Sequence, residues 1–528
     1  GSAEEEAAAF IKANVTKRTG NPTGTKPVTG APWTAKAIAD TVPGSLFFSG
    51  SAGDRPLTCI VTDSRTAREG ALFCALPGTK VDGWRFAAHA CERGASAVLA
   101  PVRIEGLAVP QIVVPDVRRA LAVVASAWYG NADRNTALVG VTGTNGKTTT
   151  VRLVGSVGAA GGFVPSTIGT LGATLRGEDF PFDTAWNTTP EAHELRRLLK
   201  ALNDAGSTLT AMEVSSHGLA LDRVWGLSFR VAVFTNLTTD HLDFHGSLDE
   251  YFRAKARLFE DLAPSSTAVI NIDDRHGQKL VGRTAAKVLT YGFSPSADIH
   301  PLEVADLPWI KGRVKLPQGT ITLEMPLAGR FNVANAMAAI GTGLALGLAP
   351  EEIARGLKDA TPAPGRFEPV QAGQDFAVIV DYAHTPDALE NVLMAARSMT
   401  GNTGRVICVV GCGGDRDPFK RPVMGRIASE IADVCVFTSD NPRSEDPEAI
   451  LDAISEGVPK GRTFERIESR KAAIRHAISV ARRGDIVVIA GKGHEPYQEI
   501  QGVRYPFDDR LEARAALEEL AGKTIKKP

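Results

Sequence analysis

Ala137-Leu-Val-Gly-Val-Thr-Gly-Thr-Asn-Gly-Lys-Thr-Thr-Thr150 is the stretch around which this chain is organised. Its apolar beginning predicts a strand, its glycines a tight loop and its end the start of a helix. Such a loop turns backbone N–H groups toward an anion, and the helix adds the positive end of its dipole. Lys147 can reach the β- and γ-phosphates of a nucleotide, and the Thr148 hydroxyl can bind magnesium. A plain glycine-rich turn, which is the alternative, would not need Lys-Thr at its end.

Length and composition limit the classes of protein that this chain can be. A chain of 528 residues has room for several domains, and 43% hydrophobic residues with 52 glycines are typical of an α/β protein. The 59 basic and 60 acidic residues nearly cancel, so no overall field favours nucleic acid or an anionic membrane. No apolar run approaches the ~20 residues that span a bilayer, and the acidic start is unlike a signal peptide. We therefore expect a cytoplasmic protein without membrane insertion, whose six scattered cysteines are buried thiols.

The chain is expected to divide into a leading extension and three α/β domains. Gly1-Ser2 is interpreted as an expression scar and residues 1–32 as a flexible extension. Short strands alternate with helices over residues 33–134, 135–364 and 365–528. Within the first domain, Asp63-Ser64-Arg65 follows a strand and either caps a helix or binds phosphate or ribose.

Polar residues follow the apolar strands of the second domain. Glu213 ends a strand, where it either binds magnesium or faces solvent, and the polar run Ser215–His217 favours the functional interpretation. The loop Thr239–His245 carries two histidines and two carboxylates, and we rank one magnesium-binding histidine above a zinc cluster. Periodicity alone predicts that Lys255 is a solvated surface lysine. Asn332 caps the helix that follows, contacts a nucleotide, or does both.

The third domain is predicted to be a doubly wound, mostly parallel sheet, with strands at 377–381, 406–410, 434–438 and 486–490. The turn Gly411–Arg416 invites a dinucleotide interpretation, which Arg416 disfavours because it replaces the third glycine. Polar groups gather at the strand ends, namely Asp381, Arg416, Asp440–Arg443 and Gly491–Glu495. Two arginines and two carboxylates suit a ligand with both ammonium and carboxylate groups, which describes an amino acid. Surface ion pairs are the alternative interpretation.

Taken together, these motifs resemble the Mur ligases over nearly the whole chain after residue 33. The residues that carry the resemblance are Thr62–Arg65, Gly78–Gly83, Gly143–Thr148, Asn187–Pro190, Glu213–His217, Asp240-His241, Ala254-Lys255, Asn332 with Asn335, Asp381–His384, Gly411–Arg416, Asp440–Arg443 and Gly491–Glu495. Their order and spacing make the resemblance specific. It implies a small α/β UDP-sugar-binding domain, a central P-loop ATPase-type domain and a C-terminal Rossmann-like domain that binds an amino acid.

The resemblance also implies roles for single residues. The positions that match the ATP site are Gly143, Thr144, Asn145, Gly146, Lys147, Thr148, Thr149, Asn332, Arg366 and Asp381. Those that match the site for the UDP-sugar and its dipeptide are Thr62, Ser64, Thr79, Lys80, Val81, Asn187, Thr188, Thr189, Ser215 and Arg223, with Leu221 where the family often has glutamine. Those that match the site for diaminopimelate are Arg416, Asp440, Asn441, Pro442, Arg443, Gly491 and Glu495. The positions that match catalytic residues are Lys147, Glu213, His241 and Lys255. Two magnesium ions would be held by Thr148, Glu213, His241 and Lys255, the last as a carbamate.

The implied activity is ATP-dependent amide-bond formation in peptidoglycan precursor synthesis. Meso-diaminopimelate would join the D-glutamate γ-carboxylate of UDP-N-acetylmuramoyl-L-alanyl-D-glutamate through an acyl phosphate. Diaminopimelate users of the family carry Asp-Asn-Pro-Arg, which is intact at Asp440–Arg443; Arg443 can form a bidentate bond with the distal carboxylate that lysine lacks. The alternatives are an L-lysine-adding enzyme, another Mur or folylpolyglutamate-type ligase, and a non-catalytic nucleotide switch. We expect a monomer that binds only small molecules and closes about a hinge near Pro362–Gly365.

Overall fold

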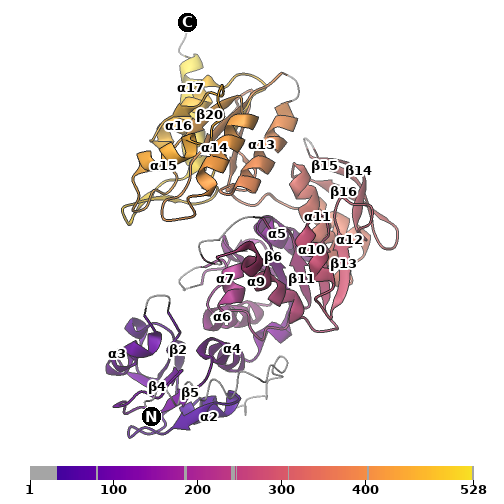
Figure 1. Ribbon diagram of the computed structural model, residues 1–528. Helices are drawn as coiled ribbons and strands as arrows, with labels where there is room; N and C mark the ends of the chain where they lie inside the picture. The colour runs from indigo at the N-terminus through magenta and orange to yellow at the C-terminus, as the bar shows by residue number, and fades with distance from the viewer. Residues whose placement is uncertain are drawn as a thin grey trace.

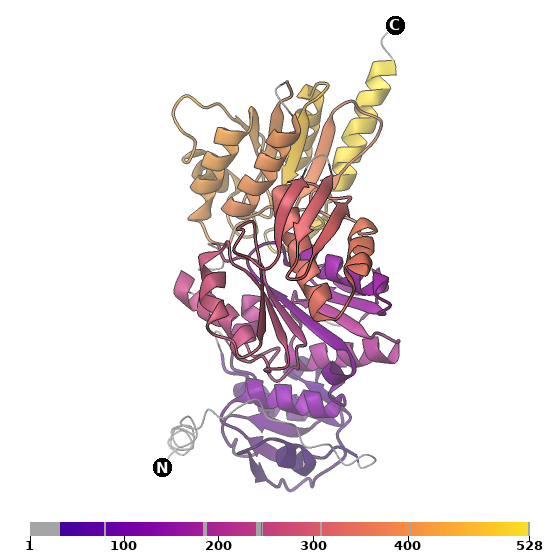
Figure 2. The same ribbon diagram turned by 90° about the vertical axis from the view of Figure 1, so that its right-hand side faces the viewer.

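The computed structural model describes residues 32–78, 81–182, 187–238, 244, 246–306, 309–400 and 403–525. They form three α/β units that follow one another along the molecule (Figures 1 and 2). The N-terminal unit lies at one end, the C-terminal unit at the other, and the unit that carries the phosphate loop lies between them. The predicted three-domain α/β class is confirmed. No helix within the described ranges is long and apolar enough to cross a membrane.

The N-terminal unit is a five-stranded sheet in the order β1-β5-β4-β3-β2, parallel except for β1. Its elements are α2 (Ala35–Thr41), β1 (Leu46–Phe48), β2 (Cys59–Val61), β3 (Ala71–Cys74), α3 (Ala87–Glu92), β4 (Ala95–Ala100), β5 (Gln111–Val113), α4 (Val117–Trp128) and 3-10 turns at Ser64–Thr66, Gly83–Phe86 and Ala132–Asn135. The Asp63 side chain accepts a hydrogen bond from the Arg65 backbone and caps the first of these turns, as the capping interpretation predicted.

The central unit contains an eight-stranded sheet in the order β13-β12-β11-β6-β10-β7-β8-β9, in which only the pairs with β8 are antiparallel. Its elements are β6 (Ala137–Thr142), α5 (Lys147–Ala160), β7 (Pro165–Gly169), β8 (Gly172–Leu175), β9 (Glu178–Asp179), α6 (Ala192–Asp204), β10 (Leu209–Glu213), α7 (Ser216–Ala220), β11 (Val231–Phe234), α9 (Leu248–Glu260), β12 (Thr267–Asn271), α10 (Arg275–Val281), β13 (Lys287–Tyr291), β14 (His300–Ala305), β15 (Ile310–Lys315), β16 (Thr320–Met325), α11 (Arg330–Ala345) and α12 (Pro350–Lys358). The antiparallel sheet β14-β15-β16 was not predicted.

Successive residues of β6 face opposite sides of this sheet, and each side has its own core. Val139 and Val141 are fully buried in a cluster with residues of α5 and α11, whereas Leu138 belongs to a cluster with residues of α6 and α9. An apolar run is therefore required along the whole strand, because both faces are covered by helices. This packing fixes the direction in which β6 delivers the phosphate loop.

The C-terminal unit is a six-stranded sheet in the order β17-β18-β22-β19-β20-β21, with only β17 antiparallel, beside the hairpin β23-β24. Its elements are β17 (Glu368–Pro369), β18 (Ala377–Asp381), α13 (Pro386–Thr400), β19 (Val406–Val410), α14 (Lys420–Ile431), β20 (Val434–Phe437), α15 (Pro447–Ser455), β21 (Glu465–Arg466), α16 (Arg470–Val480), β22 (Ile486–Ala490), β23 (Tyr497–Ile500), β24 (Val503–Pro506) and α17 (Asp509–Ile525). All four predicted strands are present, in the predicted parallel arrangement. All six cysteines are free thiols, and four of them are buried.

Candidate active site

The phosphate loop connects β6 to α5, and its two glycines are required by the structure. Gly143 has φ +152°, and a Cβ there would lie 1.8 Å from the Thr235 hydroxyl. Gly146 has φ +84°, and its Cβ would lie 2.4 Å from Asn335 Oδ1. Asn236 stabilises the loop, since its backbone carbonyl accepts from Thr144 N (2.8 Å) and its side-chain Oδ1 accepts from Asn145 N (2.9 Å). The loop is thus held open in front of the first turn of α5, where an anion can be bound.

Two lysines meet at this loop from different helices. Lys147 begins α5 and donates to the carbonyl oxygens of Gly143 (2.9 Å) and Thr144 (2.8 Å). Lys255 lies on α9, is 1% exposed, and donates to the same Gly143 oxygen at 2.9 Å. Its Nζ is also 4.6 Å from the centre of the Tyr251 ring. The interpretation of Lys255 as a solvated surface lysine is therefore wrong, because α9 turns this residue toward the phosphate loop.

Glu213 lies beside the loop at the end of β10 and is 2% exposed, so the interpretation as a solvent-facing carboxylate is also wrong. Its Oε1 accepts from the Thr148 hydroxyl and from Thr170 N, both at 2.9 Å, and its Oε2 accepts from the Thr170 hydroxyl at 3.2 Å. Arg366 Nη2 donates to Thr148 Oγ1 at 3.4 Å. A buried carboxylate beside a hydroxyl is an oxygen donor set that suits magnesium when phosphate and water complete the coordination.

The described residues contain no group of three or more His, Cys, Asp or Glu side chains that could hold a metal. The zinc alternative concerned Asp240, His241, Asp243 and His245, which lie outside the described residues. His241, which was expected to bind magnesium, lies outside the described residues, as do Thr79 and Lys80.

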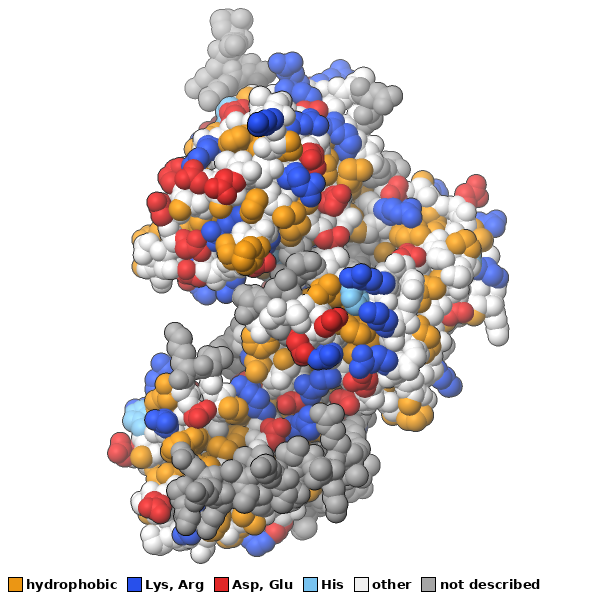
Figure 3. Space-filling view, in the orientation of Figure 1, with side chains coloured by type: hydrophobic (Ala, Val, Ile, Leu, Met, Phe, Trp, Pro, Cys, Tyr) orange, Lys and Arg blue, Asp and Glu red, His pale blue; other side chains and the backbone are white. Residues whose placement is uncertain are grey.

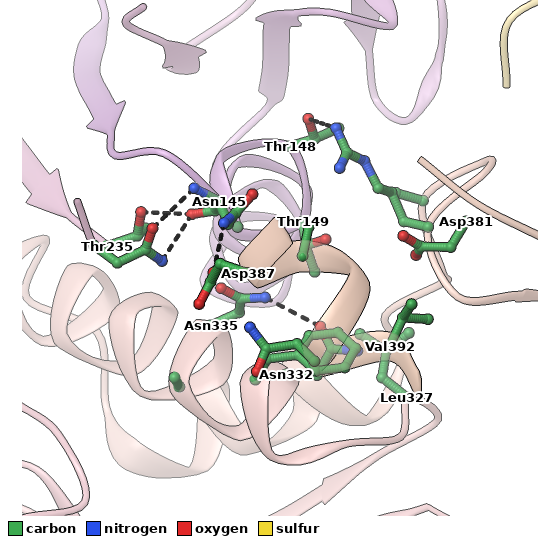
Figure 4. A pocket seen from close by; sticks show the side chains of 18 of the residues that line it. Asn145, Thr148, Thr149, Thr235, Leu327, Asn332, Asn335, Asp381, Asp387 and Val392 are labelled. Atoms are coloured by element: carbon green, nitrogen blue, oxygen red, sulfur yellow. Dashed lines mark hydrogen bonds between the residues drawn. The ribbon is translucent and has the colours of Figure 1, made fainter. Parts of the chain in front are cut away.

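A pocket runs from the phosphate loop to the first helix of the C-terminal unit (Figure 4). It is lined by Asn332 and Asn335 of α11 and by Asp381 and Asp387 of the C-terminal unit. Asn335 Nδ2 donates to Asn332 Oδ1 at 3.1 Å, while Asn145 Nδ2 donates to Asp387 Oδ2 at 2.8 Å and joins the two units. Gly329, not Asn332, is the N-cap of α11, so the capping interpretation of Asn332 is wrong. The pocket adjoins the phosphate loop and is lined by several amide side chains, which suit the hydrogen-bonding groups of a nucleotide.

Asp381 is held in an unusual electrostatic state at the edge of this pocket. Burial raises its pKa to about 6, although Arg366 and the backbone N–H of Phe367 oppose the shift. Its Oδ2 accepts from Phe367 N at 2.6 Å. The guanidinium of Arg366 lies 4.7 Å from the centre of the Tyr382 ring. Arg366 thus contacts Thr148 of the central unit and Tyr382 of the C-terminal unit, and it lies at the junction of the two.

The residues expected to hold the peptide end of the substrate form a hydrogen-bonded group near Glu213. Thr189 Oγ1 donates to the Glu213 backbone oxygen and accepts from Ser215 N, both at 2.9 Å. Arg223 Nη1 donates to Thr189 O at 2.9 Å, and the hydroxyls of Thr188 and Thr170 are 3.2 Å apart. Arg223 Nε also lies 3.4 Å from the carboxylate of Glu191. The structure therefore gathers Thr188, Thr189, Ser215 and Arg223 at one place; Asn187 adjoins them in sequence.

The other expected sugar-site residues lie in the N-terminal unit. Ser64 is buried, and its Oγ lies 3.0 Å from His89 Nδ1. Thr62 directly follows β2, and Val81 is 48% exposed. Figure 3 shows that the surface is hollowed between this end of the molecule and the C-terminal unit.

The carboxyl ends of the C-terminal strands form a polar crevice. Gly491 follows β22 with φ +118° and donates to Asp381 O at 3.0 Å, and a Cβ there would lie 2.6 Å from Asp440 Oδ2. Arg443 adopts φ +50°, donates to Gly414 O at 2.7 Å, and has its Nε 3.8 Å from Glu499 Oε2. The structure brings Asp440, Asn441, Arg443, Gly491 and Glu495 to one edge of the sheet, and the exposed Arg416 lies on the neighbouring loop.

Four residues of these sites were given no role of their own in the analysis of the sequence. Thr170 contacts Glu213, and Asp387 contacts Asn145. Tyr382 packs under Arg366, and Lys492 is buried between Asn441 and Glu495. The signal for Lys492 was available, because a lysine two residues after a fully apolar strand lies at the crevice edge of a parallel sheet. Thr170 and Asp387 gave no such signal.

Comparisons with known proteins agree with this arrangement. Three family models match: the Mur ligase family catalytic domain at residues 56–129, the Mur ligase middle domain at 141–343, and the Mur ligase glutamate ligase domain at 365–493. The UDP-N-acetylmuramoyl-L-alanyl-D-glutamate--2,6-diaminopimelate ligase of Solibacter usitatus is 47% identical over 470 residues, covering 87% of this chain and 93% of that protein. The protein of the same name from Gloeobacter violaceus is 48% identical over 468 residues, covering 88% and 94%.

Solved structures give the same result. A structure of a UDP-N-acetylmuramoyl-L-alanyl-D-glutamate--2,6-diaminopimelate ligase matches with a TM-score of 0.64 and 36% identity, over 88% of this chain and 96% of the other. MurF from Acinetobacter baumannii, at 22% identity and a TM-score of 0.62 over 94% and 99% of the chains, shares the fold. This chain belongs to the Mur ligase family.

Proposed function

We propose that this chain is the ATP-dependent ligase that joins meso-diaminopimelate to the D-glutamate γ-carboxylate of UDP-N-acetylmuramoyl-L-alanyl-D-glutamate in peptidoglycan precursor synthesis. The observation that carries the proposal is the pairing of a phosphate loop with a crevice in which Asn441, Arg443 and Glu495 lie together. The curated relatives at 47% and 48% identity bear the name of this activity. A nucleotide switch would have no use for the crevice.

The proposed sites divide among the three units. ATP would bind at Gly143–Thr149 with Asn332, Arg366 and Asp381. The UDP-sugar dipeptide would bind at Thr62, Ser64, Thr79–Val81, Asn187–Thr189, Ser215 and Arg223. Diaminopimelate would bind at Arg416, Asp440–Arg443, Gly491 and Glu495. Within the crevice, Glu495 and Asp440 suit the ammonium groups of the amino acid, and Arg443 suits its distal carboxylate.

The chemistry follows from the weakness of a carboxylate as an acyl donor. The γ-carboxylate attacks the γ-phosphorus of ATP, the bond to the β-phosphate oxygen breaks, and an acyl phosphate and ADP form. Lys147 is placed to offset charge on the transferring phosphoryl group. The amine then attacks the acyl carbon, the acyl–oxygen bond breaks, phosphate leaves, and the amine loses its proton as the amide forms. Water must be excluded, because it would hydrolyse the acyl phosphate.

Magnesium and a carbamate on Lys255 belong to this proposal. Bound magnesium would neutralise phosphate charge, and Thr148, Glu213 and His241 would help to hold two ions. Lys255 is buried beside a second ammonium group, so CO2 addition to its neutral amine would replace a cation by an anionic oxygen ligand. Replacing the Lys255 ammonium group by a carbamate would place an anion next to Lys147, with which Lys255 shares the Gly143 carbonyl.

We also propose domain limits at residues 33–134, 135–364 and 365–528, with residues 1–32 as an extension. Closure of the third domain over the second would exclude water. Tyr382 N donates to Gly365 O at 2.8 Å and Phe367 N donates to Asp381, so the segment from Gly365 on moves with the C-terminal domain. We propose a monomer, because one chain carries residues for all three substrates. We propose that the enzyme works in the cytoplasm, because ATP is available there.

The test is phosphate release with ATP, magnesium and UDP-N-acetylmuramoyl-L-alanyl-D-glutamate, with meso-diaminopimelate, with L-lysine and with no amino acid. We expect release that depends on diaminopimelate and yields the tripeptide product. Equal release with lysine would retain the ligase assignment and contradict the role of Arg443. No stimulation by either amino acid would contradict the proposed function and reopen a sister ligase or a nucleotide switch.

A further inference from the structure

Lys492 is a fully buried lysine in the amino-acid crevice. It follows β22, is 0% exposed, and donates from Nζ to Asn441 Oδ1 at 2.9 Å and to Glu495 Oε2 at 3.1 Å. Its Nζ lies 5.5 Å from the centre of the Tyr497 ring. A buried cation is costly unless its donors are satisfied and an opposite charge is near. Both conditions are met here by residues of the crevice itself.

The partners of Lys492 are held in one orientation by the same network. Asn441 Oδ1 accepts from Lys492 and also from Glu499 N at 2.9 Å, so the oxygen of the amide must face these two donors. The amide nitrogen then donates to Glu495 Oε2 at 2.9 Å. Glu495 Oε2 therefore accepts from two side chains, whereas Oε1 accepts one long bond, from the Tyr382 hydroxyl at 3.5 Å. Oε1 is the carboxylate oxygen left for a ligand.

We infer that Lys492 is a positioning residue for the amino-acid substrate: it fixes Asn441 and Glu495 so that Glu495 Oε1 meets the substrate ammonium group. This inference rests on the proposed function of the crevice. Lys492 cannot touch the substrate itself, because no part of its side chain is exposed. Its ammonium group lies 3.1 Å from Glu495 Oε2 and holds that oxygen away from the substrate side.

A merely structural role would act differently. If Lys492 only held the edge of the sheet together, its loss would weaken the fold and affect all three substrates alike. A positioning role predicts a selective loss, because Asn441 and Glu495 lie in the amino-acid crevice and the phosphate loop lies in another unit. The effect should also disappear when Glu495 no longer carries a charge.

The experiment compares steady-state kinetics of the full chain for four proteins: wild type, Lys492→Met, Glu495→Gln and the double variant. Lys471→Met is the matched control, since Lys471 forms an exposed ion pair with Glu512 at 3.2 Å in the same unit. We expect Lys492→Met to raise KM for meso-diaminopimelate about tenfold or more, which is roughly 1.4 kcal/mol of binding. KM for ATP and for the UDP-dipeptide should stay within about twofold, and the control should match wild type.

The double variant separates the two roles and remains informative if Lys492→Met alone fails to fold. It replaces the buried lysine and its partly buried carboxylate partner by neutral groups of similar size, an exchange that proteins often tolerate. We expect its KM for diaminopimelate to equal that of Glu495→Gln. An unchanged KM in Lys492→Met, a parallel loss for all substrates, or a double variant clearly worse than Glu495→Gln would each overturn the inference. Failure of the wild type to form the tripeptide would instead overturn the proposed function.

Discussion

Lys147 and Lys255 donate to the same acceptor, the backbone oxygen of Gly143, each at 2.9 Å. Two ammonium groups on one carbonyl are like charges that repel each other, and one of them, that of Lys255, is buried. A carbamate on Lys255 would turn this repulsion into attraction and supply oxygen ligands for magnesium. The geometry therefore leads to a prediction about a modification of this side chain.

We predict that Lys255 carries a carbamate and that the enzyme needs it. Enzyme depleted of CO2 should lose most of its phosphate release and regain it on addition of bicarbonate. In 13C NMR with labelled bicarbonate, the wild type should give a carbamate signal that is missing from Lys255→Met. The same variant should lower kcat by about a hundredfold or more, as the loss of an electrostatic contact to the transferring group does.

The control for this prediction is Lys200→Met, because Lys200 forms an exposed pair with Asp204 on the outside of α6. This variant should keep both the carbamate signal and the activity. A wild type with no signal and no response to bicarbonate would contradict the modification.

A second prediction compares two glycines that flank α5 and have nearly the same positive φ. Gly146 (φ +84°) precedes α5 and Gly162 (φ +85°) follows it, but a Cβ would collide with Asn335 only at Gly146. Alanine at either position should destabilise the fold by about 1–2 kcal/mol because of the positive φ. Only Gly146→Ala should lower the affinity for ADP, by roughly a hundredfold, because the loop and Asn335 must move. Calorimetric titration with ADP and magnesium checks this, and equal affinities of the two variants would refute it.

Much of this site could be predicted because its parts are local in the sequence. The strand, loop and helix at Ala137–Thr150 follow from apolar pattern and glycine placement alone. The polar groups of the crevice could be predicted because parallel strands end at the same edge, so that Asp381, Asp440 and Gly491 had to meet there. Here local pattern and topology determine the structure.

Other features depend on contacts between distant segments. Thr170 reaches Glu213 only because β7 lies beside β10, and Asp387 reaches Asn145 across two units. Lys255 is a different case, because the signal was present: it lies four residues from Tyr251 and four from Phe259, both buried on α9. A charged residue within an apolar stripe indicates a buried functional group, and reading the charge as a sign of exposure was the error.

A third prediction concerns the choice of amino acid. Arg443 is anchored by Gly414 and lies 3.8 Å from Glu499, and L-lysine lacks the distal carboxylate that would form a bidentate pair with its guanidinium. Arg443→Ala should therefore lower kcat/KM for meso-diaminopimelate by about a thousandfold and reduce the preference over lysine, while ADP affinity is unchanged. Arg504→Ala is the matched control, because Arg504 also lies 3.8 Å from Glu499 but is 65% exposed. Retained turnover in Arg443→Ala would refute the assignment of this residue.

A final prediction concerns two titrating groups on either side of Arg366. Burial lowers the pKa of His494 from 6.5 to about 4, with help from Arg366, and burial raises the pKa of Asp381 from 3.8 to about 6. The contribution of His494 to stability is complete above pH 6.5 and is lost as the pH falls toward 4. The contribution of Asp381 is complete below pH 3.8 and is lost as the pH rises through 6. Between pH 4 and 6 the contribution of His494 to the free energy of unfolding rises with pH while that of Asp381 falls, so the two changes oppose each other.

When one of the two groups is removed, the free energy of unfolding should change with pH as the remaining group alone dictates. The measurement is the free energy of unfolding of the C-terminal unit, obtained by urea denaturation of the full chain at several pH values. Relative to wild type, His494→Gln should become less stable as the pH rises from 4 to 6. Asp381→Asn should become more stable over the same range. Each change is on the order of 3 kcal/mol over the whole window. The double variant should return to the flatter profile of the wild type, since both terms are then absent. Parallel profiles for all four proteins would show that Asp381 and His494 titrate as they do in the unfolded chain, and that burial at this junction does not shift them.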